Sequence, residues 1–238
     1  MVKINNFAVV IPSYNESKNI SILISGINKN LKNALIVIID DSAMEENEKI
    51  KKIIKKFKNI ELITRLKKSG RGSAVLIGFK RVLKYKKIDY IFEMDSDLAH
   101  DPKEFSRFIK EIEVYPYDLV IGSRYKSGGK IDNISPNRTI MSRLINYFLY
   151  FWLNIKISDY TSGFRLYSRN AVIFLLKTKI KAKGFIALSE IAYKLSKNNF
   201  KISEVPITWN YRIYGKSNVN FNELVTSLLH VIKMKFFK

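Results

Sequence analysis

The feature of this sequence that most constrains its fold is a regular alternation of short apolar runs with longer stretches of helical periodicity. The runs are nearly uninterrupted, which is typical of parallel strands covered on both faces of a sheet. Between them, large apolar residues recur every three or four positions, as on the buried face of an amphipathic helix. This order predicts an α/β fold with a mostly parallel central sheet flanked by helices. The predicted strands are 7–11, 35–39, 61–64, 90–94 and 118–122, and the predicted helices cover 20–31, 50–57, 70–82 and 102–112.

The second half of the chain departs from this alternation. It contains a helix that is apolar on nearly every face, and it ends in an amphipathic stretch with lysines at its end. No repeat or linker interrupts the chain, so we expect a single domain over residues 1–220. The stretch 221–238 is expected to be a helix that either packs on this domain or attaches to a membrane surface. The elements expected here are a polar loop at 127–136, helices at 138–153 and 188–196, a loop from 159 leading to a short helix, and strands at 200–204 and 207–211 broken by Pro206.

Composition narrows the class of protein. The chain has 238 residues, 47% of them hydrophobic, which is enough for a sizeable core. It has no cysteine and two histidines, which excludes a disulfide framework, a cysteine-ligated zinc site and a histidine-rich metal site. No apolar run approaches the roughly 18–20 residues of a membrane span, and the first residues lead straight into a strand rather than a secretory signal. We therefore expect a cytoplasmic protein.

The net charge of +21 is unusual for a chain of this length. Such a surface attracts polyanions, anionic lipid or phosphorylated substrates. The alternative is a lysine-rich surface with no specific partner, and charge alone does not separate these possibilities.

Polar side chains follow four of the predicted strands. In open parallel sheets ligands bind beyond the carboxyl ends of the strands, so these segments are the expected site. Asp95 and Asp97 flank Ser96 after the fourth strand, where two carboxylates can converge on a hard cation such as Mg²⁺ whose remaining ligands are phosphate oxygens. The alternative is an acidic turn that caps the next helix. The segments after the other three strands are 12–16, 40–42 and 123–125.

The remaining candidates are open to two interpretations each. Asp41 can accept hydrogen bonds from a base or ribose, or cap the next helix. Tyr14 and Glu16 can contact a nucleotide, or brace the turn that starts a helix. Arginines stand at predicted loops and helix starts in a chain that otherwise prefers lysine, and their planar fork suits phosphate, although any single one can be surface charge. These arginines are Arg124, Arg138, Arg165 and Arg212.

Taken in order, the motifs of this chain resemble those of the inverting family 2 glycosyltransferases with the GT-A fold, and most closely the dolichol-phosphate mannose synthases. The resemblance runs from about Phe7 to Asn220, and its most specific parts lie in the second half. The motifs are Val-Ile-Pro-Ser-Tyr-Asn-Glu at 10–16, Ile-Asp-Asp at 39–41, Gly-Arg-Gly-Ser-Ala at 70–74, Met-Asp-Ser-Asp-Leu at 94–98, Gly-Ser-Arg-Tyr at 122–125, Asp-Tyr-Thr-Ser-Gly-Phe-Arg-Leu-Tyr at 159–167, Glu-Val-Pro-Ile at 204–207, and the stretch from Arg212 to Ser217.

This resemblance implies a role for each matching position. Pro12, Tyr14 and Glu16 would line the nucleotide site, with Ile39 and Asp41 near the base and ribose. Asp95, Ser96 and Asp97 would hold the diphosphate, and the two aspartates would bind Mg²⁺ or Mn²⁺. The acceptor phosphate would meet Arg124, Arg138, Ser142, Arg212 and Lys216, and the helix from Arg138 onward would face a lipid. The residues expected to be catalytic are Asp97, Arg124, Arg138 and Arg212.

Three positions depart from the family pattern. The turn after Asp41 reads Ser-Ala-Met-Glu at 42–45 where relatives carry a Gly/Asn-Ser-Pro-Asp turn, which bears on base selectivity. Ala99 replaces the Gln or Ser found in many relatives, so a water can replace one metal contact. Asn218 replaces a lysine, for which Lys216 is a possible substitute.

The reaction that the resemblance implies is transfer of mannose from GDP-mannose, with inversion, to a polyprenyl (dolichyl) phosphate. An ionised phosphate oxygen needs no catalytic base, since its second pKa is about 6. Two alternatives remain at this stage: a UDP-sugar-dependent family 2 enzyme with another acceptor, and a non-enzymatic polyanion-binding protein. The expected partners are a nucleotide-sugar, a polyprenyl-phosphate lipid and the cytoplasmic face of a membrane, with helix 138–153 and the C-terminal helix as alternative attachments or core elements. Nucleic acid is not an expected partner, because a polyanion groove would avoid the acidic motifs.

Overall fold

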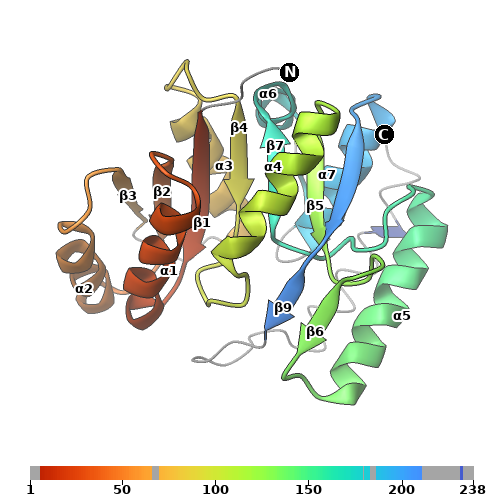
Figure 1. Cartoon of the computed structure of the whole chain (residues 1–238), viewed down its shortest axis with the longest axis horizontal. Coiled ribbons are helices and arrows are strands. Elements are labelled where there is room, and N and C mark those ends of the chain that lie inside the picture. The colour runs from red at the N-terminus through yellow and green to blue at the C-terminus, as the bar shows by residue number, and fades with distance from the viewer. Residues whose placement is uncertain (1–5, 66–69, 179, 183–185, 211–230, 233–238) are drawn as a thin grey trace.

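A computed structural model describes residues 6–65, 70–178, 180–182, 186–210 and 231–232 (Figure 1). Its centre is a seven-stranded sheet with the strand order β3-β2-β1-β4-β7-β5-β8. All neighbouring strands are parallel except β7, which runs antiparallel to both β4 and β5. The strands are β1 (Phe7–Ser13), β2 (Leu35–Asp40), β3 (Ile60–Thr64), β4 (Tyr90–Glu93), β5 (Leu119–Ser123), β7 (Arg165–Ser168) and β8 (Ile202–Pro206).

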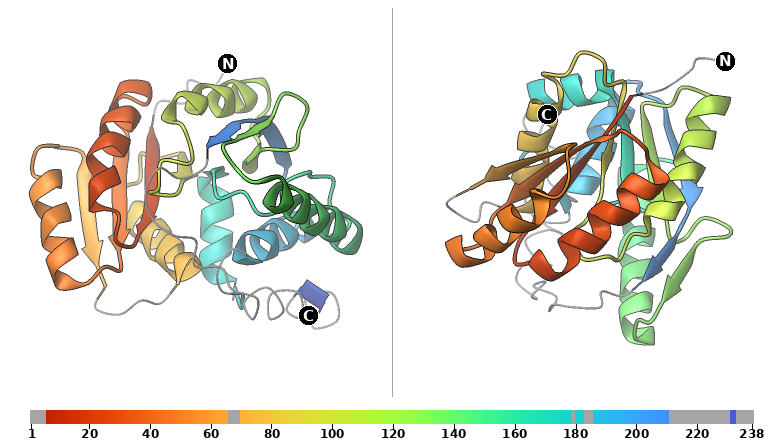
Figure 2. Two further views of the ribbon diagram at one scale, coloured as in Figure 1. Left: turned by 90° about the horizontal axis from the view of Figure 1, so that it is seen from below. Right: turned by 60° about the vertical axis from the view of Figure 1, so that its left-hand side comes forward.

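Helices cover both faces of this sheet. Successive residues of β1 point to opposite faces, so that Ala8 and Val10 join one apolar core while Val9 and Ile11 join the other. The view from below in Figure 2 shows the two helical layers with the sheet between them. The first core is covered by α3 (Arg71–Val82), α5 (Pro136–Leu153), α6 (Arg169–Lys177) and α7 (Ile186–Lys197), and the second by α1 (Ser17–Asn30), α2 (Met44–Ile54) and α4 (Phe105–Val114), the last preceded by a short 3₁₀ turn at Pro102–Glu104.

The five strands and four helices expected in the first half are confirmed, and so is the mostly parallel sheet. Strand β7 was missed, because its segment was expected to be a loop followed by a short helix. It begins with Arg165 and ends with Ser168, and its first three residues, the arginine included, are buried. Arg165 is fully buried because its guanidinium donates to the main-chain oxygens of Tyr160, Ser162 and Leu188. A strand whose buried arginine is hydrogen-bonded to main-chain oxygens shows no uninterrupted apolar run in the sequence. The sequence pattern therefore does not predict it.

A second, two-stranded sheet lies below the large one in Figure 1. It pairs β6 (Lys130–Asp132) in parallel with β9 (Thr208–Asn210). The expected break at Pro206 is confirmed, since β8 ends there and β9 begins two residues later. Strand β6 lies within the segment that was expected to be a polar loop. This small sheet stands beside the start of α5.

Helix α5 confirms the helix expected at 138–153, but only part of it is covered. Asn146, Leu149 and Leu153 are buried, while most of the other large side chains remain exposed. The expected C-terminal helix at 221–238 lies outside the described residues apart from Val231 and Ile232. Val231 is buried, and its carbonyl oxygen accepts a hydrogen bond of 3.1 Å from Trp152 Nε1 on α5. Within the described part of the chain no helix is long and apolar enough to cross a bilayer.

Candidate active site

The carboxyl ends of β1, β2 and β4 bring three of the expected segments together. Ser96 Oγ donates to the carbonyl oxygen of Pro12 at 3.0 Å. The main-chain N–H of Asn15 donates to Ser42 Oγ at 2.8 Å. These two hydrogen bonds join the loops after β1, β2 and β4 into one edge, at the place where parallel sheets bind ligands.

The acidic loop after β4 presents its two carboxylates differently. The Asp95 side chain is 33% exposed, whereas Asp97 is buried and its Oδ1 accepts from the main-chain N–H of Ala99 at 3.2 Å. No group of three or more metal-ligating side chains occurs among the described residues. Two carboxylates with no sulfur or imidazole ligand suit a hard cation that takes its other ligands from phosphate and water. The donor set therefore fits Mg²⁺ or Mn²⁺ bound together with a diphosphate.

Arg71 is a charged neighbour of this loop that sequence reasoning missed. It is the first residue of α3, and its Nε donates to Asp95 Oδ1 at 2.8 Å. Its Nη1 contacts Glu93, the last residue of β4. Burial alone would lower the pKa of the Arg71 guanidinium, but the carboxylates of Asp95 and Glu93 raise it above its ordinary value. Arg71 is therefore a fixed cation at the edge of the acidic loop.

The loop after β2 contains two aspartates with different partners. Asp40 is fully buried and accepts from Ser42 Oγ at 2.6 Å and from Asn47 Nδ2 at 2.7 Å, so it braces the start of α2. Asp41 forms a two-pronged ion pair with Arg65, a residue that sequence reasoning also missed. The Arg65 guanidinium in turn donates to Ser73 Oγ at 2.7 Å. Asp41 is thus held in place by an arginine that itself borders the site.

The other residues expected at the nucleotide site take several positions. Tyr14 is exposed at the edge, and the Glu16 carboxylate accepts from Asn19, which favours the bracing interpretation for Glu16. The Ile39 side chain is fully buried and faces α3, because a methyl group at Gly78 would lie 2.7 Å from its Cδ1. Ile39 can therefore face a ligand only through its main chain.

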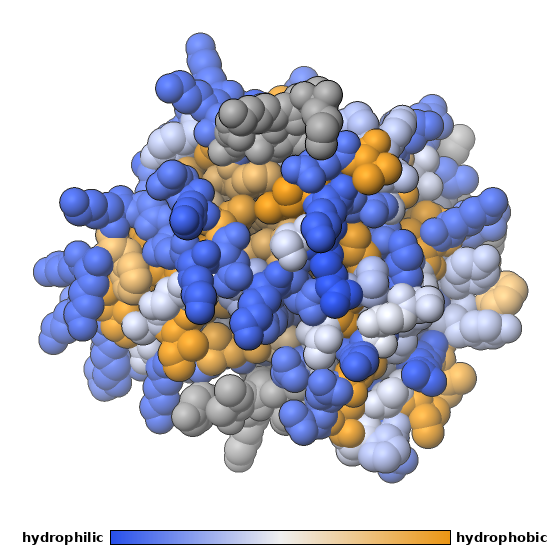
Figure 3. Space-filling model, viewed as in Figure 1, coloured by the Kyte–Doolittle hydropathy of each residue, from blue (hydrophilic) through white to orange (hydrophobic). Residues whose placement is uncertain are grey.

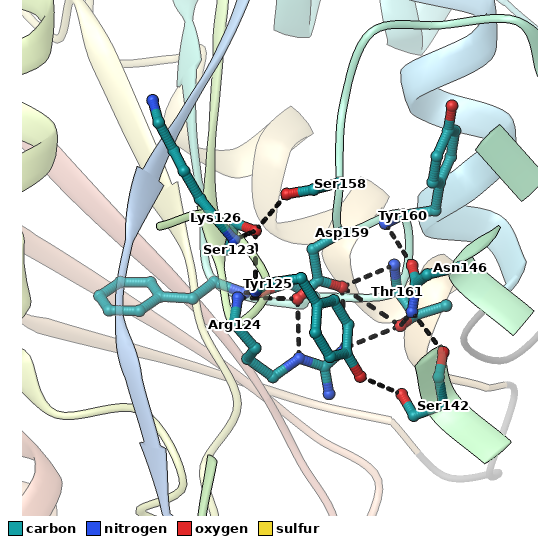
Figure 4. Close-up of polar contacts among 12 residues, drawn as sticks. Ser123, Arg124, Tyr125, Lys126, Ser142, Asn146, Ser158, Asp159, Tyr160 and Thr161 are labelled. Carbon is teal, nitrogen blue, oxygen red and sulfur yellow. Dashed lines mark hydrogen bonds and ion pairs between the residues drawn. The ribbon is translucent and has the colours of Figure 1, made fainter. Parts of the chain in front are cut away.

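Arg124, which follows β5, is held by the loop that follows α5 (Figure 4). Its Nε and Nη2 donate to the two carboxylate oxygens of Asp159 at 2.7 and 2.8 Å, and Nη2 also donates to Thr161 Oγ1 at 2.7 Å. Burial acts to raise the pKa of Asp159, but the Arg124 cation keeps it below its ordinary value. Beneath the pair, Glu204 accepts from the main-chain N–H groups of Ser158 and Asp159. Arg124 is thus oriented by an ionised carboxylate.

Helix α5 is tied to the same network. Ser142 Oγ accepts from the hydroxyl of Tyr125 at 2.6 Å, as Figure 4 shows. Asn146 accepts from the main-chain N–H of Tyr160 at 2.7 Å. Arg138 is exposed in the first turn of α5, one turn before Ser142. The structure therefore brings Arg124 and Ser142 together. Arg212 and Lys216 lie outside the described residues, and Arg165 is the buried structural residue of β7.

His100 connects the two halves of the site. It is buried, its Nδ1 accepts from the main-chain N–H of Asp95 at 3.3 Å, and its ring stacks on Phe164 with centroids 5.1 Å apart. Burial lowers the pKa of His100. The carboxylates of Asp95 and Asp97 act to raise this pKa, and the guanidinium groups of Arg71 and Arg124 act to lower it. One neutral imidazole thus lies within electrostatic reach of the acidic loop and of both fixed arginines.

A cavity of about 630 Å³ lies beside Arg124, between the loop after β5 and one flank of α5. Its lining is basic, aromatic and amide in character, with no acidic side chain. The residues are Arg124 to Gly129, Arg143, Asn146, Tyr147, Tyr150, Ile157 and Ser158.

Comparison with known proteins shows the family to which the chain belongs. The model of glycosyl transferase family 2 matches residues 8–176. Polyprenol monophosphomannose synthase of Mycolicibacterium smegmatis is 28% identical over 225 residues, which cover 94% of this chain and 84% of that protein. Undecaprenyl-phosphate mannosyltransferase of Micrococcus luteus is 26% identical over 212 residues, which cover 89% and 86% of the two chains.

Among solved structures, glucosyl-3-phosphoglycerate synthase of Mycobacterium tuberculosis, in complex with Mn²⁺, UDP and glucosyl-3-phosphoglycerate, shares the fold. The TM-score is 0.66 at 16% identity, over 98% of this chain and 79% of that one. The expected GT-A fold is confirmed. A non-enzymatic polyanion-binding protein is the wrong interpretation of the charge, because the matched family consists of transferases. The chain belongs to glycosyl transferase family 2 and is a glycosyltransferase with a GT-A fold.

Proposed function

We propose that this enzyme transfers mannose from GDP-mannose, with inversion, to a polyprenyl phosphate. Support comes from the names of the two relatives, one a polyprenol monophosphomannose synthase and the other an undecaprenyl-phosphate mannosyltransferase. The structural observation that carries the proposal is the position of Arg124. This arginine lies within electrostatic reach of Asp95 on one side and beside the exposed flank of α5 on the other. A phosphate on a lipid chain needs both a cation and an apolar surface.

On the donor side, Asp41, Tyr14 and the turn at 12–16 would contact the nucleoside. The loop at 95–97 would lie against the diphosphate. A divalent cation on Asp95 and Asp97 would supply charge neutralisation for the departing diphosphate. The Ser96 hydroxyl is already bound to the Pro12 carbonyl, so it holds the two loops together rather than facing the donor.

On the acceptor side, Arg124, Arg138 and Ser142 would orient the lipid phosphate. One ionised phosphate oxygen attacks the anomeric carbon, the new carbon–oxygen bond forms on the face opposite the diphosphate, and the bond to the diphosphate breaks. GDP leaves with the bonding electron pair. A single displacement of this kind inverts the anomeric centre. The nucleophile carries its charge at neutral pH, so catalysis needs positioning and charge stabilisation rather than a base.

We also propose that the enzyme works at a membrane surface and meets it through α5. The exposed side chains Ile140, Leu144, Tyr147 and Phe151 recur at helical spacing along one face of this helix. The cavity beside them carries Lys126 and Arg143, and the chain as a whole carries a net charge of +21. An apolar helix face bordered by cations is the arrangement that binds anionic bilayers. In Figure 3 hydrophilic side chains cover most of the visible face, and hydrophobic ones reach the surface at the lower right, the corner that α5 occupies in Figure 1.

A panel assay tests the reaction. The protein is incubated with polyprenyl phosphate, a divalent cation and each of several labelled nucleotide-sugars, and the lipid is then extracted. Label in the lipid phase with GDP-mannose alone is the expected result, and β-linked product confirms inversion. Absence of labelled lipid with every donor would overturn the proposal.

A UDP-sugar donor is the second candidate. The observation in its favour is the turn after Asp41, where Ser42 and Asn47 hold the buried Asp40 in a sequence unlike the family's usual one. The structural neighbour from M. tuberculosis carries UDP, although at 16% identity this neighbour supports the fold alone. The same panel separates the two candidates by the nucleotide that each transfer reaction releases.

A further inference from the structure

Arg71 pairs with one of the two carboxylates that the proposed function assigns to a divalent cation. Two of its nitrogens share one oxygen of Asp95: Nε lies 2.8 Å and Nη2 2.7 Å from Oδ1. An oxygen that accepts two charge-assisted hydrogen bonds is a weaker ligand for a metal ion. The side chain of Arg71 is 21% exposed, so little water screens its charge from the carboxylate.

Glu93 fixes the guanidinium in this position. It is 1% exposed, and its Oε1 contacts Arg71 Nη1 while its Oε2 accepts from the hydroxyl of Tyr167 at 2.7 Å. Tyr167 is itself fully buried on β7. Arg71 is therefore anchored from the interior of the sheet and reaches outward to Asp95, so it is not a mobile surface side chain.

Gly163 closes the arrangement from the other side. A methyl group in place of its hydrogen would lie 2.5 Å from Arg71 Nη2 and 3.0 Å from Asp95 Oδ2. The main chain of the 159–164 loop thus packs directly against the ion pair, and no larger residue would leave it intact. A side chain at position 163 would therefore displace the end of the Arg71 guanidinium from its place beside Asp95.

We propose that Arg71 is a positioning residue that competes with the divalent cation for Asp95, and that it keeps the metal affinity of the free enzyme low. The proposal rests on the assignment of Asp95 and Asp97 to the metal in the proposed function. The acidic loop would then bind its metal tightly only when a nucleotide diphosphate brings further oxygen ligands and negative charge.

The test is Mn²⁺ binding to the full chain without nucleotide, followed by isothermal titration or by the electron paramagnetic resonance signal of free Mn²⁺. Arg71→Leu is expected to bind Mn²⁺ about tenfold more tightly than the parent, because the competing charge is gone. Glu93→Gln is expected to bind it more weakly, because Arg71 then pairs with Asp95 alone. A merely structural role would weaken binding in both variants.

Arg71→Leu leaves the buried Glu93 carboxylate without its cation and can therefore misfold. A second variant, which removes the charge of Glu93 as well, keeps the test valid in that case. Arg71→Leu/Glu93→Gln keeps the local net charge of the parent, and the glutamine can still accept from Tyr167. It is also expected to bind Mn²⁺ more tightly than the parent, because Asp95 Oδ1 is released. Arg81→Leu, on the same helix but paired with Glu61, is the matched control and should leave Mn²⁺ binding unchanged.

The outcomes separate this inference from the proposed function. If Asp97→Asn abolishes Mn²⁺ binding while the double variant binds like the parent, the metal site stands and the role of Arg71 is overturned. If neither the parent nor the double variant binds Mn²⁺ even when GDP is added, both are overturned. Binding that appears only in the double variant would support the competition directly.

Discussion

The guanidinium of Arg124 and the carboxylate of Asp159 face each other as two forks, with nitrogen–oxygen distances of 2.7 and 2.8 Å. Asp159 is fully buried and the Arg124 side chain is 14% exposed. The main-chain N–H of Arg124 also donates to Asp159 Oδ2 at 3.0 Å. The carboxylate thus fixes both the backbone and the side chain of the arginine that the proposed mechanism directs at the acceptor phosphate.

Replacing the carboxylate should destabilise the fold in a pH-dependent way. Asp159→Asn leaves Arg124 as an uncompensated buried charge, which costs about 3–5 kcal/mol of unfolding free energy near neutral pH. The folded-state pKa of Asp159 is lowered, so its contribution is fully present above the pKa of the unfolded chain. That contribution is lost as the pH falls through the folded-state value. Thermal unfolding of parent and variant should therefore differ most at pH 7 and converge in acid; a constant difference would contradict this.

Arg124→Lys should reduce turnover by about tenfold or more, because one ammonium cannot bridge Asp159 and Thr161 while also contacting a phosphate. The measurement is the initial rate of lipid labelling in the panel assay. Arg107→Lys is the matched control, since the exposed Arg107 on α4 also pairs with a buried carboxylate, that of Glu104 in the 3₁₀ turn before α4. Equal rates for the two variants would make Arg124 a structural residue only.

Asp97→Asn should abolish metal-dependent transfer while the protein stays folded. Its Oδ1 accepts a hydrogen bond from the main-chain N–H of Ala99, and an asparagine oxygen can accept the same bond. The rate is measured across a range of Mg²⁺ and Mn²⁺ concentrations, with thermal unfolding as the check on folding. Glu48→Gln, at an exposed ion pair on α2, controls for the loss of one negative charge. Transfer by the variant at the parent's rate would refute the metal assignment.

The membrane proposal predicts that polar substitutions on α5 weaken vesicle binding. Leu144→Ser should lower binding to vesicles of anionic phospholipid, prepared without polyprenyl phosphate, by several-fold in a sedimentation assay. Ile22→Ser is the matched control: Ile22 and Leu144 are each 58% exposed, but Ile22 lies on α1. Binding should also weaken from low to high salt, because the Debye length shrinks to about 8 Å at physiological ionic strength. Vesicle binding that changes neither with salt concentration nor with the Leu144→Ser substitution would contradict this proposal. The absence of any vesicle binding would contradict it as well.

Local pattern was sufficient to predict the strands that carry the donor half of the site. The runs ending at Ile11, Ile39 and Met94 are apolar and regularly spaced, and topology alone then places their following loops at one edge. The acidic loop after β4 was identified for the same reason.

The partners of these residues could not be predicted from local pattern. Arg71 and Glu93 are 22 positions apart, and Arg124 and Asp159 are 35 apart, so each pair exists only after the sheet has formed. Arg71 lies in a glycine-bearing turn that gave no sign of its ion pairs. Arg165 was open to two interpretations, phosphate contact or surface charge, and neither foresaw its burial, which depends on carbonyl groups from three separate positions. Buried apolar residues recur along the sequence with the period of the helix or strand that carries them. Buried charged residues follow no such period, so the sequence pattern does not reveal them.

The antiparallel strand β7 also has a consequence for the order in which the protein can be built. Strand β5 pairs with β7 and β8 but not with β4, and both of its partners are synthesised after it. Until residues 165–168 leave the ribosome, β4 keeps an open edge and β5 has no neighbour. The nascent chain therefore carries an unpaired strand edge through the synthesis of about seventy residues after β4, and such edges are prone to intermolecular pairing. Insertion of β7 closes that edge and joins the donor half of the sheet to β5, whereas the other edge of β5 stays open until β8 is synthesised. The sheet is therefore complete, and Glu204 in place beneath Asp159, only after residue 206.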